Sequence, residues 1–163
     1  IETPGAVMNI QDICTACPER LVGVAFGCEY FMTELGGQHD SEGQSIFTAR
    51  AMIAMGAKAN NVVPIDTVHI RVHDLEDLEK NLILSRKLGF EGMLVLNPKE
   101  LPLVHQYYSP SEEQVQWAKE MLELSEEAVK QGKGVAMKDN KFIGPPMVKM
   151  AKDILKLNNL CKK

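Results

Sequence analysis

Short apolar runs alternate with amphipathic segments along the chain. Residues 21–26 form an apolar run that is closed by Gly27, which is typical of a strand buried on both faces. Residues 62–70 form the next strand region. We expect Pro64 at or before its start, because proline cannot donate a hydrogen bond inside a central strand. Residues 92–96 are predicted as a further strand.

Helices are predicted between and after these runs. Apolar residues at helical spacing favour helices over residues 7–15, 45–59, 101–107 and 146–157. Asp74 begins a helix that runs through Leu88 and is ended by Gly89. Ser111 and Gln114 form a capping box, which opens a helix to about residue 131. Residues 135–143 have a hairpin-like pattern.

Buried strands that alternate with helices predict an α/β chain with a parallel sheet, as an open sheet or as part of a barrel. Only about three and a half strands are present, so both edges of such a sheet would be exposed. We therefore expect the fold to need an upstream or partner half. The chain opens on Ile1 rather than Met, and residues 1–3 look like the end of a strand. A processed product, a fragment or a sequence incomplete at its front would each explain this.

Composition adds few constraints. The 163 residues are 45% hydrophobic and 25% charged, as in ordinary soluble globular domains. The net charge of −4 and the dispersed basic residues argue against nucleic acid or an anionic membrane as partners. No apolar run approaches the ~20 residues that span a bilayer.

The cysteines offer one motif. Cys14 and Cys17 form a C-x-x-C pair, but no further ligands follow at the spacing of a zinc site, since Cys28 and His39 stand alone. On a helix the pair would share one face as two buried small residues, and a metal or redox role is the alternative. The cysteine usage fits a reducing compartment.

A series of short motifs occurs in a fixed order. They are Ile1-Glu2-Thr3, Phe26-Gly27-x-Glu29, Ala49-Arg50, Ile65-Asp66-x-Val68, Leu88-Gly89-Phe90-x-Gly92, Asn97-Pro98, Tyr108-Ser109-Pro110-Ser111 and Gly132-Lys133-Gly134. In this order the chain resembles the back half of the citrate lyase β-subunit and its β-like relatives, in the HpcH/HpaI aldolase superfamily.

The resemblance implies a partial TIM (β/α)8 barrel, from the end of strand five to strand eight, with a C-terminal helical extension. Residues 1–108 would be the second half of the barrel, and residues 109–163 the extension that packs on the barrel or on a neighbouring subunit. Because such proteins usually assemble as trimers, we expect a homo-oligomer or a subunit of a larger protein complex. Neither nucleic acid nor a membrane span is expected.

The resemblance also implies chemistry. Members of this family bind magnesium and CoA thioesters, and they make or break carbon–carbon bonds next to a carbonyl or hydrolyse the thioester. Glu2 matches one metal carboxylate, whereas Tyr30 stands where the second carboxylate belongs. Glu2 and Glu29 are therefore the candidate metal ligands, although in an extended chain Glu29 would face away from the side that residue 30 faces.

Other family positions have also changed. The family's catalytic acid corresponds to Gly144, so no catalytic residue is assigned to this chain. Leu96-Asn97-Pro98 replaces an Ile-His-Pro motif, and Met93 replaces a lysine. His69, Arg71 and His73 would share one strand face by their spacing of two. They would form a polar strand edge, or the two histidines would bind a metal with Glu2 as a third ligand.

Three hypotheses about function remain open. The first is a degenerate, catalytically inactive structural or accessory subunit, and the second is a Mg-dependent acyl-CoA lyase or thioesterase, of citramalyl-CoA or malyl-CoA type, with a rearranged site. The third is a module that binds CoA without turnover, with Lys99 and Lys133 near the nucleotide phosphates. The resemblance favours the mitochondrial matrix, with the cytoplasm as the alternative.

Overall fold

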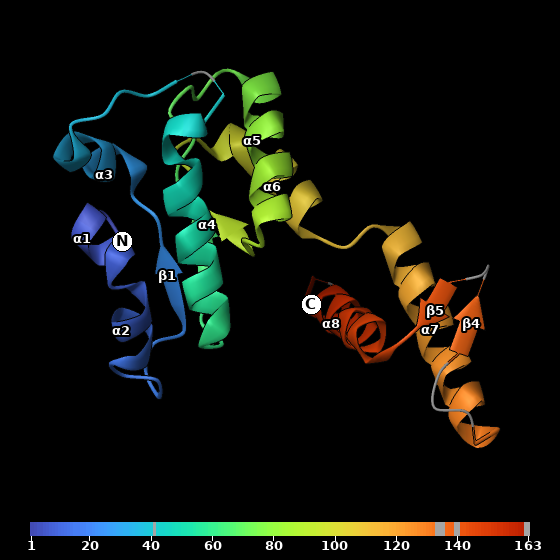
Figure 1. Ribbon diagram of the computed structural model, residues 1–163. Helices are drawn as coiled ribbons and strands as arrows, with labels where there is room; N and C mark the ends of the chain where they lie inside the picture. Colours follow the sequence, from blue (N-terminus) through green and yellow to red (C-terminus); the bar gives the residue numbers. More distant parts are fainter. Residues whose placement is uncertain (41, 133–135, 139–140, 162–163) are drawn as a thin grey trace. The chain divides into compact units, whose positions relative to one another are not determined.

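The computed structural model describes residues 1–40, 42–132, 136–138 and 141–161. The chain divides into two compact units, Ile1–Tyr108 and Ser109–Lys163, which lie at the blue-to-yellow and orange-to-red ends of the colour bar in Figure 1. None of the described helices is long and apolar enough to cross a membrane.

A three-stranded parallel sheet organises the first unit. Its strands β1 (Gly23–Ala25), β2 (Val63–Asp66) and β3 (Gly92–Met93) lie in the order β1-β2-β3. Val24 pairs with Pro64, and Ile65 pairs with Gly92. The predicted parallel α/β arrangement is confirmed, but each strand is shorter than its apolar run.

Pro64 lies inside β2 rather than at or before its start, which corrects the prediction from sequence. In a parallel ladder, alternate residues bond to opposite neighbours. Val63 bonds towards β1, since its N–H donates to Val22, whereas Pro64 faces β3, since its carbonyl accepts from the N–H of Glu91. The pairing with β3 begins only at Ile65, so the missing N–H of Pro64 costs no ladder hydrogen bond.

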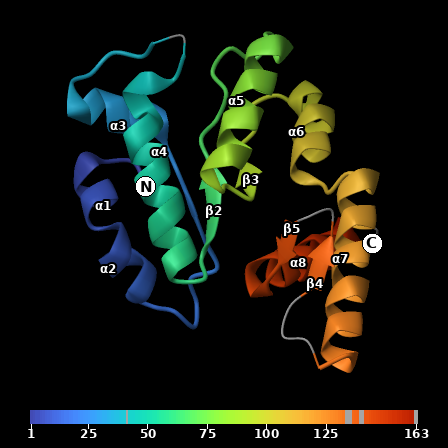
Figure 2. The same ribbon diagram turned by 45° about the vertical axis from the view of Figure 1, so that its right-hand side comes forward.

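Seven helical segments accompany the sheet in the described part of this unit. They are α1 (Pro4–Met8), α2 (Ile10–Thr15), α3 (Cys28–Leu35), α4 (Gln44–Ala59), α5 (Leu75–Leu88), the 3-10 turn η1 (Pro98–Glu100) and α6 (Leu101–Tyr108). The helix predicted over residues 7–15 is two helices that meet at Asn9, and α3 was not predicted. In Figures 1 and 2, α4 lies between the α1–α2 pair and α5.

Apolar side chains of the sheet and the helices form the core of the first unit. Phe26, Ile53, Leu78, Leu82 and Phe90 are fully or almost fully buried there. The ends of α5 follow the predicted signals, since Asp74 accepts the N–H of Asp77 and Gly89 ends the helix at φ +95°.

The second unit consists of α7 (Glu112–Lys130), the antiparallel pair β4 (Ala136–Lys138) and β5 (Lys141–Ile143), and α8 (Pro145–Cys161). The predicted capping box is present, because Ser111 accepts the N–H of Gln114 and the Gln114 side chain accepts the N–H of Ser111. Helices α7 and α8 pack together around Ala118, Met121 and Ala151.

Candidate functional site

The position of Glu2 is set by Ile1, which is hydrogen-bonded to the chain at the end of β1. The Ile1 amine donates to the carbonyl of Ala25 at 2.7 Å, and the Ile1 carbonyl accepts the N–H of Gly27 at 2.9 Å. Ile1 therefore runs beside the end of β1 as a strand would. Glu2 is exposed and lies against Gly27, where an added Cβ would be 2.6 Å from the Cγ of Glu2. A side chain at position 27 would therefore displace Glu2.

Gly27 is also the N-cap residue of α3. The start of this helix is fixed by the N–H of Cys28, which donates to the hydroxyl of Thr67 at 3.2 Å. An edge-to-face contact between Phe26 and Phe31, with ring centroids 5.4 Å apart, fixes it further. Glu29 therefore lies in the first turn of a helix, and the extended geometry assumed from sequence is wrong.

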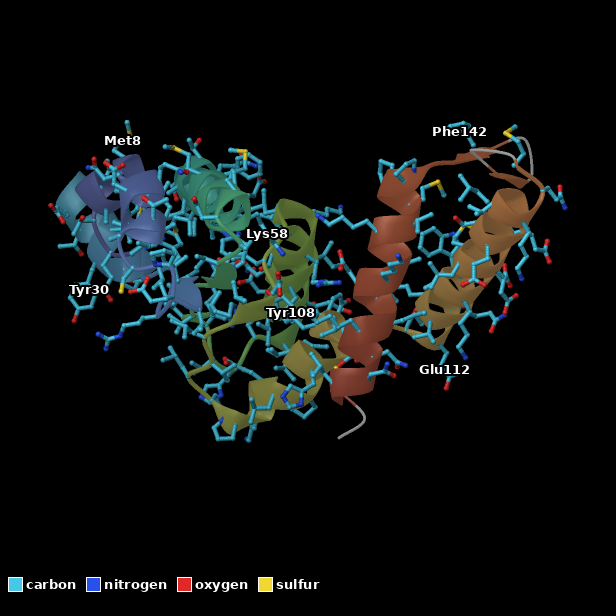
Figure 3. All side chains as sticks on the ribbon, turned by 90° about the horizontal axis from the view of Figure 1, so that it is seen from below. Met8, Tyr30, Lys58, Tyr108, Glu112 and Phe142 are labelled. Atoms are coloured by element: carbon cyan, nitrogen blue, oxygen red, sulfur yellow. The ribbon has the colours of Figure 1, made fainter. Side chains whose placement is uncertain are left out.

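Tyr30 lies on the solvent side of α3. Its side chain is 70% exposed, and Figure 3 shows it at the outer edge of the unit. Successive residues of a helix point in directions about a quarter-turn apart, so Glu29 and Tyr30 face different ways. The phenol of Tyr30 therefore points into solvent and away from the buried Cys28.

Glu29 contacts two other potential ligands. Its Oε1 atom is 3.1 Å from Nε2 of His39 and 3.4 Å from Sγ of Cys28. The three ligand atoms all lie within 4.8 Å of one another. Glu2 is not a member of this group among the side chains that the structure describes. Cys28 and His39 therefore do not stand alone, which corrects the interpretation from sequence.

Burial dominates the acidity of Cys28. The pKa of the thiol is raised to about 11, chiefly by burial and further by the hydrogen bond to Glu29 and the negative charges of Glu29 and Asp66, although the hydrogen bond with Thr67 lowers it. Without a bound cation the thiol is therefore protonated at neutral pH.

The chain reversal after α3 explains why His39 lies so close. Gly36 ends the helix at φ +71°, and the N–H groups of Gly36 and Gly37 both donate to the carbonyl of Met32. Asp40 then accepts the N–H groups of Gln44 and Ser45 at the start of α4. These hydrogen bonds hold the pKa of Asp40 well below its ordinary value. The Gly36-Gly37 pair is the sequence signal that could have predicted this reversal.

A buried ion pair lies at the end of β2. Asp66 accepts from Nε of Arg50 at 3.2 Å and from Nη2 at 2.5 Å, and both side chains are almost completely buried. Asp66 also accepts the N–H of Thr67 at 2.8 Å. The pair therefore links α4 to the loop that holds Cys28 through Thr67.

His69, Arg71 and His73 do not share a strand face, because β2 ends at Asp66. His69 is buried and contacts Asp77 at 2.9 Å, and Arg71 contacts the same carboxylate at 3.4 Å. His73 is exposed. The prediction of a shared strand edge is wrong for this geometric reason.

A second buried acid was missed from the sequence. Glu100 is almost completely buried, and its Oε1 atom lies 3.9 Å from Nδ1 of His69. Neither atom has a hydrogen-bond partner in the described part of the protein. Asn97 and Glu100 have the spacing of a capping box, and the structure contains it, but this motif predicts a hydrogen bond to the N–H of Asn97 and not the burial of the acid.

The remaining candidates lie elsewhere. Cys14 is buried in α2. Cys17 is half-buried, and its thiol donates a hydrogen bond to the carboxylate of Glu19; neither cysteine forms a disulfide. Lys99 is exposed in η1, and Lys133 lies outside the described residues. Gly144 belongs to the second unit, where an added Cβ would be 2.8 Å from the ring of Phe142.

Known proteins share both sequence and fold with this chain. The citrate lyase subunit beta of Haemophilus influenzae is 32% identical over 155 residues, covering 95% of this chain and 53% of its own length. The mitochondrial citramalyl-CoA lyase of Homo sapiens is 29% identical, covering 96% of this chain and 48% of its own length. The chain thus spans about half the length of the curated relatives it matches.

Among solved structures, protein CitE from Mycobacterium tuberculosis has the same fold with a TM-score of 0.80 at 24% identity, over 98% of this chain and 59% of that protein. Its crystals contain magnesium, acetoacetate and coenzyme A. The HpcH/HpaI aldolase/citrate lyase family profile matches residues 1–98. This match covers more than half of the chain, so the chain belongs to the HpcH/HpaI aldolase/citrate lyase family.

Proposed function

We propose that the protein is a degenerate member of its family, a structural or accessory subunit of a larger assembly without magnesium-dependent lyase activity. The observation that carries the proposal is at the start of α3. By the resemblance of the motif, Tyr30 corresponds to the second metal carboxylate; its side chain is exposed, while the neighbouring Glu29 contacts His39 and Cys28.

The donor set here does not suit magnesium. Mg²⁺ takes oxygen ligands in near-octahedral geometry, through one or two carboxylates together with water or substrate. Glu2 supplies one carboxylate beside Gly27, but the carboxylate of Glu29 is close to a thiol and an imidazole. A neutral phenol is a poor ligand for a hard cation. These residues therefore do not fit the magnesium ion of the family.

Loss of the acid supports the same proposal. Gly144 stands at the position of the family's catalytic acid and offers no group that can donate a proton. A neighbouring residue could compensate for the loss of one metal carboxylate. The loss of the catalytic acid as well would leave no group to donate the proton.

The sheet supports a role within an assembly. We propose that residues 1–108 form the second half of a TIM-like barrel and residues 109–163 an extension that packs on it or on a neighbouring subunit. Val22 is 81% exposed and Leu96 57% exposed, at the entrance to β1 and just beyond β3. No strand pairs with the outer edge of β3 in the part of the chain that the structure describes. Unpaired edges and exposed apolar residues of this kind call for a partner half-barrel or oligomer.

Turnover is the test of the proposal. The native protein with its copurified partners is assayed with magnesium on malyl-CoA, citramalyl-CoA and acetyl-CoA, following carbon–carbon cleavage and thioester hydrolysis separately. The proposal predicts rates equal to the buffer blank. Turnover that Glu2→Ala abolishes and Met8→Ala leaves intact would refute it, because Met8 is an exposed residue outside the site.

The alternative is a magnesium-dependent acyl-CoA lyase or thioesterase with a rearranged site. The observation that favours it is that Glu29 lies one residue from the lost carboxylate, in the first turn of α3. The turnover assay decides between the two. Stabilisation of the protein by CoA without turnover would instead indicate a module that binds thioesters.

A location in the cell is proposed from the similarity to the human relative. The mitochondrial location of the human relative supports the mitochondrial matrix for this protein, with the cytoplasm as the alternative. Fractionation of the source cells, with the native protein followed by antibody, tests it.

A further inference from the structure

Cys28, Glu29 and His39 bring three different ligand types together at the start of α3. One thiol, one carboxylate and one imidazole contribute atoms that all lie within 4.8 Å of one another. Sulfur and nitrogen ligands select zinc and related transition metals, whereas magnesium and calcium select oxygen. The chemistry of this group therefore differs from that of the pair Glu2 and position 30.

Two of the three separations between ligand atoms are close to those expected around a tetrahedral ion. With Zn–S of about 2.3 Å and Zn–N or Zn–O of about 2.0–2.2 Å, neighbouring ligand atoms lie roughly 3.3–3.7 Å apart. Sγ of Cys28 is 3.4 Å from Oε1 of Glu29, and that oxygen is 3.1 Å from Nε2 of His39. A single ion can therefore contact all three atoms after small side-chain movements.

The backbone holds the three residues in place. Thr67 fixes the N–H of Cys28, and Gly36 turns the chain back after α3. Asp40, the residue after His39, accepts the N–H groups of Glu42, Gln44 and Ser45, the last two of which lie in the first turn of α4. Ligands from α3 and from the following loop are thus positioned by different elements, as in a built site.

Access and coordination number also fit. The side chains of His39 and Glu29 are 34% and 49% exposed, while Cys28 is buried on the inner side. An ion can enter from solvent, and three protein ligands leave a fourth position for water.

We propose that Cys28, Glu29 and His39 bind one zinc-type transition-metal ion at the start of α3. The proposal holds whether or not the protein cleaves a thioester, because it rests on these three side chains alone.

Metal titration tests the site. The full-length protein is stripped with chelator under reducing conditions and titrated with Zn²⁺ against a chromogenic competitor, and with Co²⁺ followed by absorbance. We expect one equivalent of Zn²⁺, no displacement by millimolar Mg²⁺, and a thiolate-to-cobalt band that Cys28→Ser abolishes. Glu29→Gln and His39→Gln should each weaken zinc binding at least about tenfold.

Matched controls make the result specific. Cys17→Ser and His105→Gln change a half-buried thiol and an exposed imidazole outside the group, and they should leave zinc affinity within about twofold. Circular dichroism checks that each variant is folded, and His39→Gln is informative even if Cys28→Ser unfolds because His39 is partly exposed. Absence of zinc binding, or binding that Cys17→Ser abolishes and the three ligand variants do not, would overturn the proposal.

Discussion

Single residues decide what the site can bind. At position 30 a phenol faces solvent, and one residue earlier a carboxylate contacts a thiol and an imidazole. The same neighbourhood contains the pair of Arg50 and Asp66, which is almost completely buried. The residues at positions 29 and 30 determine which ions can bind, whereas the pair of Arg50 and Asp66 affects the free energy of unfolding.

Asp66→Ala tests the buried pair. It leaves the Arg50 guanidinium buried without its partner, so we expect the free energy of unfolding to fall by about 3–5 kcal/mol in urea denaturation. Lys58→Met is the matched control. Lys58, which is labelled in Figure 3, pairs with Glu91 and both side chains are about half exposed, so this change should cost at most about 1 kcal/mol. Equal losses for the two variants would contradict this assignment.

At the scale of elements, close contacts between helices set the stability of the first unit. Gly56 of α4 lies against Ile10 of α2, where an added Cβ would be 2.6 Å from Cγ2 of Ile10. Ser85 of α5 and Tyr108 of α6 are joined by a hydrogen bond of 2.6 Å between their hydroxyls. Each contact yields a testable prediction.

Gly56→Ala should destabilise the protein although alanine is the better helix former. Propensity favours alanine by about 1 kcal/mol, but crowding of the buried Ile10 should cost about 1–3 kcal/mol, so we expect a lower melting temperature. A double-mutant cycle with Ile10→Ala checks the cause. The two losses should sum to more than the loss in the double variant, and strict additivity would exclude this contact as the reason.

Tyr108 should make stability depend on alkaline pH. Burial raises the pKa of its phenol to about 12, while the hydrogen bond with Ser85 lowers it. The unfolded phenol loses its proton near pH 10, so the stabilisation is complete below that pH and is lost as the pH rises towards 12. Urea unfolding between pH 9 and 11.5 should show a steeper loss for the wild type than for Tyr108→Phe. Identical slopes would contradict the raised pKa.

Local signals in the sequence identify the ends of several helices correctly. Asp74 and Gly89 bound α5, and Ser111 caps α7, because the side chains and the φ angles that make these ends act within a few residues. The length of a strand depends on pairing with strands that are distant in the sequence. Strands β2 and β3 are therefore shorter than the apolar runs that contain them. The error over His69 follows directly from that difference.

The candidate site could be predicted only in part for the same reason. The motifs point to Glu2 and to the segment after Gly27, and the structure places Glu2 against Gly27. The proximity of His39 to Cys28 depends on α3 and on the turn at Gly36, neither of which gives a periodic pattern. Burial of Glu100 depends on packing in three dimensions and has no sequence signal.

At the scale of the whole molecule, the account proposes that the sheet is completed by a partner. In the native assembly, Leu96→Lys should place a charge on the exposed apolar surface beyond β3 and reduce the mass measured by light scattering after gel filtration. Met55→Lys is the control, since Met55 is 64% exposed on α4. A wild-type protein that runs as a monomer, or an equal effect of both variants, would contradict the proposed interface.

Direct titration with Mg²⁺ tests the central claim that the magnesium site of the family is lost. The metal-free native protein is titrated by calorimetry, alongside Glu2→Gln and Tyr30→Asp. The account predicts no saturable binding to the wild type, and a gain of binding in Tyr30→Asp, which restores a carboxylate at that position. One saturable Mg²⁺ site in the wild-type protein that Glu2→Gln removes would contradict it.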